Sequence, residues 1–269
     1  RPWSALLSRT NSVTTIFYKH KYNKVIIMDK TIYNKLYGKY DDKVDLGNRI
    51  NKILNFLSKF QFDKILDIGC GDGGLTILLA KTVKAKDVYG VDISEIGLNE
   101  AKKKGIKCFK VDIDIEELPF EENYFDFVFC GEIIEHILNT DKLLKDVHKV
   151  LKTDGKLLIT TPNLASWHSR ICLLFGYNPF KCSVSFEYPE VGKILKIRDG
   201  GQEHIRFFTL KSLIELIKNY DFYIEKIFGF YEVPTNANYL IKNLAVFFDK
   251  LFSNIPSLAT AIGVFCKKK

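Results

Sequence analysis

The stretch KILDIGCGDGGL, residues Lys64 to Leu75, decides the fold of this chain. An apolar run of strand length comes first, Gly69, Gly71, Gly73 and Gly74 follow it, and the helical pattern LTILLAKTV begins directly afterwards. This order predicts a strand, a glycine turn and a helix. Such a turn lets a ligand approach the backbone, next to the unpaired N–H groups at the start of the helix.

The glycine spacing does not by itself name the ligand, because Gly69, Gly71 and Gly74 also satisfy the dinucleotide pattern GxGxxG. Asp92 ends the next apolar run, VYGVD. At the tip of a neighbouring strand it can bind both hydroxyls of a ribose, which NAD and S-adenosylmethionine share. Asp67 completes the pattern DxGxGxG, and its carboxylate suits the cationic amino-acid end of S-adenosylmethionine better than a pyrophosphate, which it would repel.

Three further motifs follow in order: KVDIDIEELPF, FDFVFCGEIIEHI and HKVLKTDGKLLITTPN. With them the chain resembles the class I S-adenosylmethionine-dependent methyltransferases over about residues 44–267, and within that class the methyltransferase type 11 or ubiquinone-biosynthesis O-methyltransferase group. The resemblance implies an α/β fold with a Rossmann-like, seven-stranded, mostly parallel sheet, helices on both faces and an antiparallel C-terminal edge strand. The cofactor-binding residues that it implies are Asp67, Gly69, Gly71, Gly73, Asp92, Ile93, Asp112 and Ile113.

Strand-length apolar runs alternate with helical patterns along the chain, which independently predicts a parallel sheet covered on both faces. The predicted strands lie near 87–91, 106–111, 125–130, 155–161, 222–233 and 262–269. The predicted helices lie at 44–60, 75–83, 94–104, 140–151, 209–220 and 239–252. Within a methyltransferase domain of residues 28–269, we expect substrate-covering insertions near 175–202 and 231–256.

Residues 1–27 are predicted to be an N-terminal extension outside the domain. They contain five basic residues, no acids and no clear amphipathic spacing, and Met28 is the only methionine of the chain. We hypothesise that translation starts at Met28; a targeting peptide is the alternative. The formal net charge of +8 includes those five bases, so residues 28–269 carry only +3, which argues against a general nucleic-acid surface.

Acidic and histidine residues gather in CGEIIEHI, after the predicted strand near 125–130. With helical spacing, Glu132 faces both Glu135 and His136, and this set suits a hard cation such as Mg²⁺ or Mn²⁺. The cation would lower the pKa of a substrate hydroxyl. His204, in EHIRFFT, is a candidate fourth ligand or general base, so the candidate catalytic residues are Glu135, His136 and His204. The alternative is that the Glu and His side chains brace the helix.

The ExxEH pattern resembles two groups, the ubiquinone-biosynthesis O-methyltransferases and the small-RNA 3′-terminal 2′-O-methyltransferases. We therefore expect O-methylation of a small-molecule acceptor, with a metal-dependent RNA 2′-O-methyltransferase as the alternative. Outside that class, an NAD-dependent oxidoreductase and a non-catalytic cofactor-binding module remain. Asn163, Trp167 and His168 are candidate acceptor-pocket residues, with helix packing as the alternative for Trp167.

Tyrosines in the segment before residue 44 are candidate lid residues, although packing or surface roles are the alternative; they are Tyr33, Tyr37 and Tyr40. Six cysteines without CxxC spacing are predicted to be reduced, buried thiols of a cytoplasmic protein. No run of 18 or more apolar residues is present, so no membrane span is expected. Lys267 to Lys269 are predicted to form a solvated tail.

Overall fold

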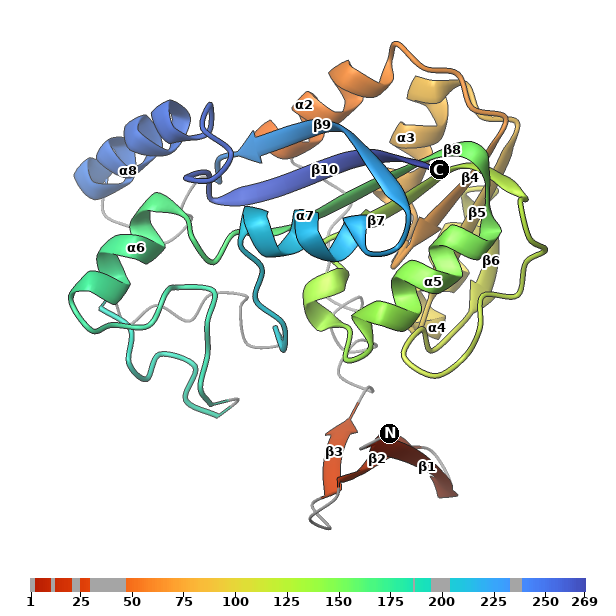
Figure 1. The fold of residues 1–269 in the computed structure, drawn as a ribbon, viewed down its shortest axis with the longest axis horizontal. Helices are drawn as coiled ribbons and strands as arrows, with labels where there is room; N and C mark the ends of the chain where they lie inside the picture. Colours follow the sequence, from red (N-terminus) through yellow and green to blue (C-terminus); the bar gives the residue numbers. More distant parts are fainter. Residues whose placement is uncertain are drawn as a thin grey trace.

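The computed structural model describes residues 3–10, 13–20, 25–29, 47–185, 187–194, 204–232 and 239–269. Its body is a seven-stranded sheet in the order β6-β5-β4-β7-β8-β10-β9 (Figure 1). The strands are β4 (Lys64–Ile68), β5 (Asp87–Asp92), β6 (Lys107–Lys110), β7 (Phe125–Gly131), β8 (Leu151–Pro162), β9 (Phe222–Phe230) and β10 (Ala261–Lys268).

The pairing confirms the predicted Rossmann-like fold. Strand β4 pairs in parallel with β5 and β7, β5 with β6, and β7 with β8, whereas β10 is antiparallel to both β8 and β9. The C-terminal strand therefore lies one position in from the edge, which β9 forms. The chain runs outward from β4 to β5 and β6, then returns to β7 on the other side of β4. Such a reversal leaves a crevice at the carboxyl ends of the strands, where ligands of open α/β sheets bind.

Helices cover both faces of the sheet (Figure 1). One hydrophobic cluster packs α5 (Thr140–Val150) and α7 (Leu210–Lys218) against Ile68 and its neighbours. A second cluster packs α2 (Asn48–Leu57) and α3 (Gly74–Val83) against Ile65 and Phe127. Helix α4 (Glu95–Lys103) follows β5. These helices confirm the predicted ones within a few residues, and Thr209 caps α7 as the sequence indicates.

A lobe beyond the carboxyl end of β8 contains α6 (Trp167–Leu174) and α8 (Tyr239–Phe252) (Figure 1). Trp167 packs against the rings of Phe248 and Phe252. Its indole N–H donates a 2.5 Å hydrogen bond to Asp249, which also accepts one of 2.9 Å from Thr260. Trp167 therefore joins the two helices, and its packing alternative is the one observed. Helix α8 falls inside the predicted insertion near 231–256, and α6 ends just before the one near 175–202; that these segments are substrate-covering insertions stays a prediction.

Three N-terminal strands form a separate antiparallel sheet: β1 (Trp3–Thr10), β2 (Val13–His20) and β3 (Val25–Asp29). Met28 lies in β3, and the predicted boundary between extension and domain at this residue stays a prediction. The candidate lid tyrosines, Tyr33, Tyr37 and Tyr40, lie outside the described residues.

The C-terminal lysines correct the prediction of a solvated tail. Lys267 and Lys268 belong to β10, and Lys268 is 8% exposed. Its ammonium donates to the Leu151 carbonyl at 2.8 Å and to Asn123 at 3.0 Å. Successive side chains of a strand point to opposite faces of the sheet, so Lys268 lies on the other face from Lys267, and there it is buried.

All six cysteines are free thiols; four are buried as predicted, whereas Cys108 and Cys182 are half-buried, which corrects the prediction for these two. No helix within the described ranges has the length and apolar content that crossing a membrane requires.

Candidate active site

The glycine loop after β4 has the backbone conformation that the sequence predicts. Gly69, Gly71 and Gly73 all have positive φ, at 79°, 53° and 78°. Gly73 caps the start of α3, and a Cβ atom there would lie 2.3 Å from the Ile106 side chain. Only glycine fits this loop without strain, and the loop keeps its backbone open next to the positive end of a ten-residue helix.

Asp92 ends the neighbouring strand β5 and holds the glycine loop in place. One carboxylate oxygen accepts from the Gly71 N–H at 2.9 Å, and the other accepts from the Ser94 N–H at 2.7 Å. Burial raises the pKa of Asp92. Each carboxylate oxygen has a second lone pair, so these hydrogen bonds leave acceptor capacity for the two hydroxyls of a ribose.

Asp67 lies under the loop, 4% exposed, and accepts a 2.5 Å hydrogen bond from the Thr76 hydroxyl of α3. Burial raises the pKa of Asp67 to about 7, against the lowering effect of the Thr76 hydrogen bond. The contact braces β4 against α3. A cationic group placed beside the loop would favour the ionised form of this carboxylate.

Asp112 and Ile113 follow β6, at the same carboxyl end of the parallel strands as Asp92, and both are buried. The Asp112 carboxylate accepts from the Asp114 N–H at 3.2 Å, so it forms the turn that the sequence allowed as an alternative. Asp114 in turn accepts from the N–H groups of Leu138 and Asn139, at 2.8 and 3.1 Å. This second acid fixes the loop beyond β7, a role that no spacing in the sequence signals.

The ExxEH stretch corrects the predicted helix. Only Ile134–His136 are helical, as the 3-10 turn η1, and Glu132 precedes it in the left-handed region with φ 52°. Glu132 therefore does not share a helical turn with Glu135 and His136, and that prediction is wrong. Its carboxylate instead contacts Arg49 at 2.9 Å and accepts from Thr160 at 2.9 Å.

Three side chains nevertheless converge: Glu135, His136 and His204 offer ligand atoms that all lie within 4.8 Å of one another. The rings of His136 and His204 are 4.9 Å apart. His204 reaches this position because the next two residues donate their backbone N–H groups to the Glu135 carbonyl, at 2.9 and 3.0 Å. The tertiary structure thus joins a residue from a distant segment to two residues of the motif.

Glu135 has one oxygen that the described residues leave without a hydrogen bond. The side chain is 2% exposed; Oε2 accepts from Thr161 at 2.9 Å, while Oε1 is buried and has no partner in this part of the chain. Burial, followed by repulsion from Glu132, raises the pKa of Glu135 well above its usual range. A buried, incompletely bonded carboxylate favours a cation or a hydrogen-bond donor beside it.

His204 is neutral at pH 7, because burial and then His136 and Lys181 lower its pKa to about 4. A neutral imidazole offers a lone pair to a cation, but with this pKa it is a weak base. The chemistry therefore favours the ligand role for His204 over the general-base role. Two imidazole nitrogens and one carboxylate oxygen form a donor set that fits Mn²⁺ or another divalent ion.

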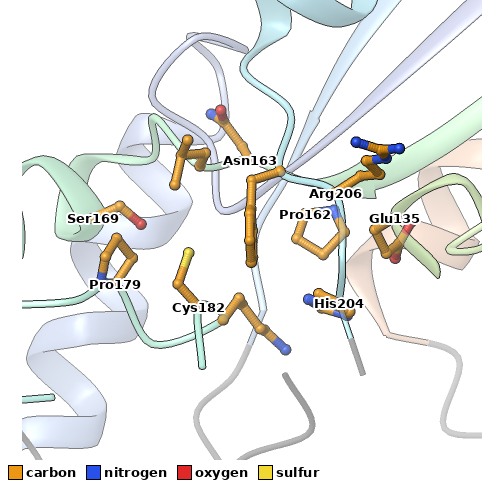
Figure 2. Close-up of a pocket in the computed structure, with 11 residues that line it drawn as sticks. Glu135, Pro162, Asn163, Ser169, Pro179, Cys182, His204 and Arg206 are labelled. Atoms are coloured by element: carbon orange, nitrogen blue, oxygen red, sulfur yellow. The ribbon is translucent and has the colours of Figure 1, made fainter. Parts of the chain in front are cut away.

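Figure 2 shows the pocket beside this group, where Glu135 and His204 lie near Arg206 and Pro162. Its enclosed space is about 10 Å³, room for one water-sized molecule. The lining residues come from the turn after β7, the end of β8, α6 and the segments around 179–182 and 204–207; they are Glu135, Pro162, Asn163, Leu164, Ser169, Pro179, Lys181, Cys182, His204, Arg206 and Phe207.

Asn163 lines this pocket, and its amide donates to the backbone carbonyls of Ser257 and Ala259, at 3.2 and 2.8 Å; its role toward an acceptor stays a prediction. It therefore braces the loop before β10 as well. Trp167 packs against α8, and the ring of His168 lies 5.7 Å from that of Phe180. Two charged pocket residues were not predicted from the sequence: Lys181 and Arg206. No sequence pattern marks either of them as a site residue.

Comparison with known proteins connects this geometry to a family. A family model described as a methyltransferase domain matches residues 40–227. The ubiquinone/menaquinone biosynthesis C-methyltransferase of Rickettsia typhi is 34% identical over 51% of this chain and 63% of its own length. The malonyl-[acyl-carrier protein] O-methyltransferase of Legionella pneumophila is 30% identical over 44% of this chain and 42% of its own. These matches span less than two thirds of either relative.

Solved structures show the same fold at low identity. A SAM-dependent methyltransferase from Aquifex aeolicus has a TM-score of 0.55 at 15% identity and covers 90% of this chain and 100% of its own. Another from Archaeoglobus fulgidus has a TM-score of 0.52 at 18% identity and covers 82% of this chain and 91% of its own. This likeness establishes the arrangement of the sheet and its helices.

Proposed function

The chain belongs to the methyltransferase-domain family, and from this premise we propose that it transfers the methyl group of S-adenosylmethionine to an oxygen atom of a small-molecule acceptor. The observation that carries the proposal is that two groups of residues lie at the carboxyl ends of the parallel strands. The glycine loop and Asp92 lie at the ends of β4 and β5, and Glu135, His136 and His204 lie beyond β7 and β8.

The cofactor part of the proposal follows from the first group. Gly69, Gly71 and Gly73 would approach the amino-acid end, and Asp92 would accept hydrogen bonds from the ribose hydroxyls. Ile93 and the pair Asp112 and Ile113 would hold the adenine. Asp67 would attract the ammonium group from below the loop. A nicotinamide cofactor fits less well, because the buried Asp67 carboxylate would repel its pyrophosphate.

In the reaction, a lone pair of the acceptor oxygen would form the new C–O bond as the C–S bond of the sulfonium breaks. The products would be a methyl ether and S-adenosylhomocysteine, and the proton of the acceptor hydroxyl would be released. The sulfonium is already activated, so positioning supplies much of the catalysis. A divalent cation, when bound, would lower the pKa of the acceptor hydroxyl.

Glu135, His136 and His204 would hold this cation, and the pocket beside them, with room for one water-sized molecule, would receive the hydroxyl group of the acceptor. The partly bonded Glu135 carboxylate and the neutral His204 support this assignment. Two relatives are named as acting on small molecules or on a carrier-bound acyl group, one by C- and one by O-methylation. Oxygen is the better acceptor atom for this chain, because a hydroxyl is the group that a hard cation activates.

The test is a calorimetric titration in two steps. S-adenosylhomocysteine is titrated first, and Mn²⁺ is then titrated into the saturated protein and into its Glu135→Gln variant. We expect one ion per chain in the parent and at least a tenfold weaker affinity in the variant. Glu225→Gln is the matched control, because Glu225 pairs with Lys156 on the surface and is expected to leave Mn²⁺ binding unchanged.

Each step can contradict one part of the proposal. A protein that binds NADH and not S-adenosylhomocysteine would be an oxidoreductase. Tight S-adenosylhomocysteine binding without Mn²⁺ binding would contradict the proposed cation site and would support methyl transfer without a metal. Cofactor binding without transfer of a labelled methyl group to any catechol, phenol or RNA-end acceptor would support a non-catalytic module.

A further inference from the structure

Four charged side chains form a series of ion pairs from the pocket to Glu132, directly after β7. Lys181, which lines the pocket, lies 3.3 Å from Glu232. Glu232 lies 3.4 Å from Arg49, and the same Arg49 nitrogen lies 2.9 Å from Glu132. The four residues come from distant segments, so the fold brings together ions that no local motif predicts.

Glu132 and Glu135 are held by consecutive residues of β8. The Thr160 hydroxyl donates to Glu132, and the Thr161 hydroxyl donates to Glu135, both at 2.9 Å. Successive side chains of a strand point to opposite faces of a sheet. The neighbours agree: Ile159 packs in the cluster of α5 and α7, and Leu158 packs in the cluster of α2 and α3. Thr160 therefore holds Glu132 on the face covered by α2 and α3, and Thr161 holds Glu135 on the face covered by α5 and α7.

Arg49 lies on the same face of the sheet as Glu132. It belongs to α2, and its guanidinium contacts the Glu132 oxygen that Thr160 does not bind. Both oxygens of Glu132 therefore have partners, Thr160 and Arg49, that do not belong to the group of Glu135, His136 and His204. Glu132 holds this position although its φ of 52° is unfavourable for a residue with a side chain.

We propose that Arg49 is a positioning residue that keeps Glu132 off the cation. The inference rests on the proposed function, in which Glu135, His136 and His204 hold a divalent ion. With Glu132 bound to Arg49, Glu135, His136 and His204 would be the protein ligands of the ion, and its other positions would be left to acceptor oxygens and water. Hard cations take six or more ligands, so a fourth protein ligand would close a position that the acceptor needs.

The test measures Mn²⁺ affinity and hydration in protein saturated with S-adenosylhomocysteine. In Arg49→Met we expect Mn²⁺ to bind about tenfold more tightly, because Glu132 is released and the site becomes more negative. We also expect the bound Mn²⁺ to relax water protons less, because Glu132 replaces a water ligand. A purely structural role for Arg49 would lower affinity and would not change hydration in this direction.

Three variants serve as controls. Lys52→Met removes another tether of α2, the 3.0 Å hydrogen bond to the Gly229 carbonyl, and is expected to leave Mn²⁺ binding unchanged. Arg49→Lys keeps the positive charge and is expected to behave like the parent. The double variant Arg49→Met, Glu132→Gln removes both charges together, and is expected to return affinity and hydration to the parent values.

The outcomes separate this inference from the proposed function. If the parent binds no Mn²⁺, the proposed cation site is contradicted, and the inference about Arg49 is contradicted with it. If the parent binds Mn²⁺ and Arg49→Met binds it no more tightly, the inference alone is overturned. A weaker affinity of Arg49→Met for S-adenosylhomocysteine would assign Arg49 to the cofactor instead. If Arg49→Met does not fold, the double variant decides, because a tenfold loss of Mn²⁺ affinity there would show that Glu132 is already a ligand.

Discussion

The carboxylate of Asp92 accepts a 2.9 Å hydrogen bond from the backbone N–H of Gly71, so the acid at the end of one strand holds the loop that follows its neighbour. The proposed ribose-binding residue therefore also shapes the proposed amino-acid subsite. Two functions that the sequence assigns to separate motifs depend on one side chain, and a substitution there affects both.

Asp92→Ala is expected to lower the affinity for S-adenosylhomocysteine at least tenfold and to destabilise the fold by about 1–3 kcal/mol, because two buried N–H groups lose their acceptor. Calorimetry and urea unfolding measure the two effects. Asp87→Ala, at the half-buried start of the same strand, removes the ion pair with Lys107 and should change neither quantity measurably. Parent-like binding by Asp92→Ala would end the ribose assignment.

Gly73→Ala is expected to destabilise the protein by about 2–4 kcal/mol, the cost of a left-handed alanine plus crowding against Ile106 and Ala101. Gly105→Ala is the matched comparison, since Gly105 also has positive φ, 87°, but its Cβ would meet nothing within 4 Å. It should cost about 1 kcal/mol. Equal losses in urea unfolding would show that the close approach at Gly73 relaxes without cost.

Asp67→Asn is expected to stabilise the protein increasingly as the pH rises from 5 to 7. The folded-state pKa of Asp67 is raised to about 7 from a usual value of 3.8, so its contribution to stability is complete below 3.8 and is lost as the pH rises through about 7. Asparagine keeps an acceptor for Thr76 and does not ionise. The difference between variant and parent should grow by on the order of 2 kcal/mol over this interval.

Urea unfolding of both proteins at pH 5, 6, 7 and 8 measures this difference. Asp87→Asn is the control, because Lys107 lowers the pKa of this surface carboxyl and a gain of the same sign is not expected. A constant difference between Asp67→Asn and the parent would contradict the raised pKa. We also expect S-adenosylmethionine binding near pH 6.5 to release protons in the parent and fewer in the variant, which calorimetry in buffers of different ionisation enthalpy detects.

Lys268→Met is expected to destabilise the protein by about 1–3 kcal/mol, because the Leu151 carbonyl and the Asn123 side chain lose a buried charged donor. Lys267→Met removes only a surface contact with Asp154 and should cost less than about 1 kcal/mol. Thermal unfolding compares the two variants. If both lysines tolerate methionine equally, the C-terminal basic residues act as the solvated tail that their sequence suggests.

The sequence by itself determined the strand, glycine turn and helix around residue 69, the alternation that builds the parallel sheet, and the cap of α7 at Thr209. These features depend on local physics: the periodicity of apolar residues, the φ values that only glycine adopts freely, and hydrogen bonds between neighbours in the chain. The acid at the end of β5 could also be found, because its distance from the glycines is set by one strand–helix–strand unit.

Only the tertiary structure decided how the charged groups of the site pair. Helical spacing placed Glu132 with Glu135 and His136, but two threonines on β8 and Arg49 on α2 hold it apart, and His204 comes from a distant segment instead. Likewise, burial in the sheet turned Lys268 inward. Such pairings depend on contacts between segments far apart in the chain, and on desolvation that exists only once the core has formed, so no local pattern records them.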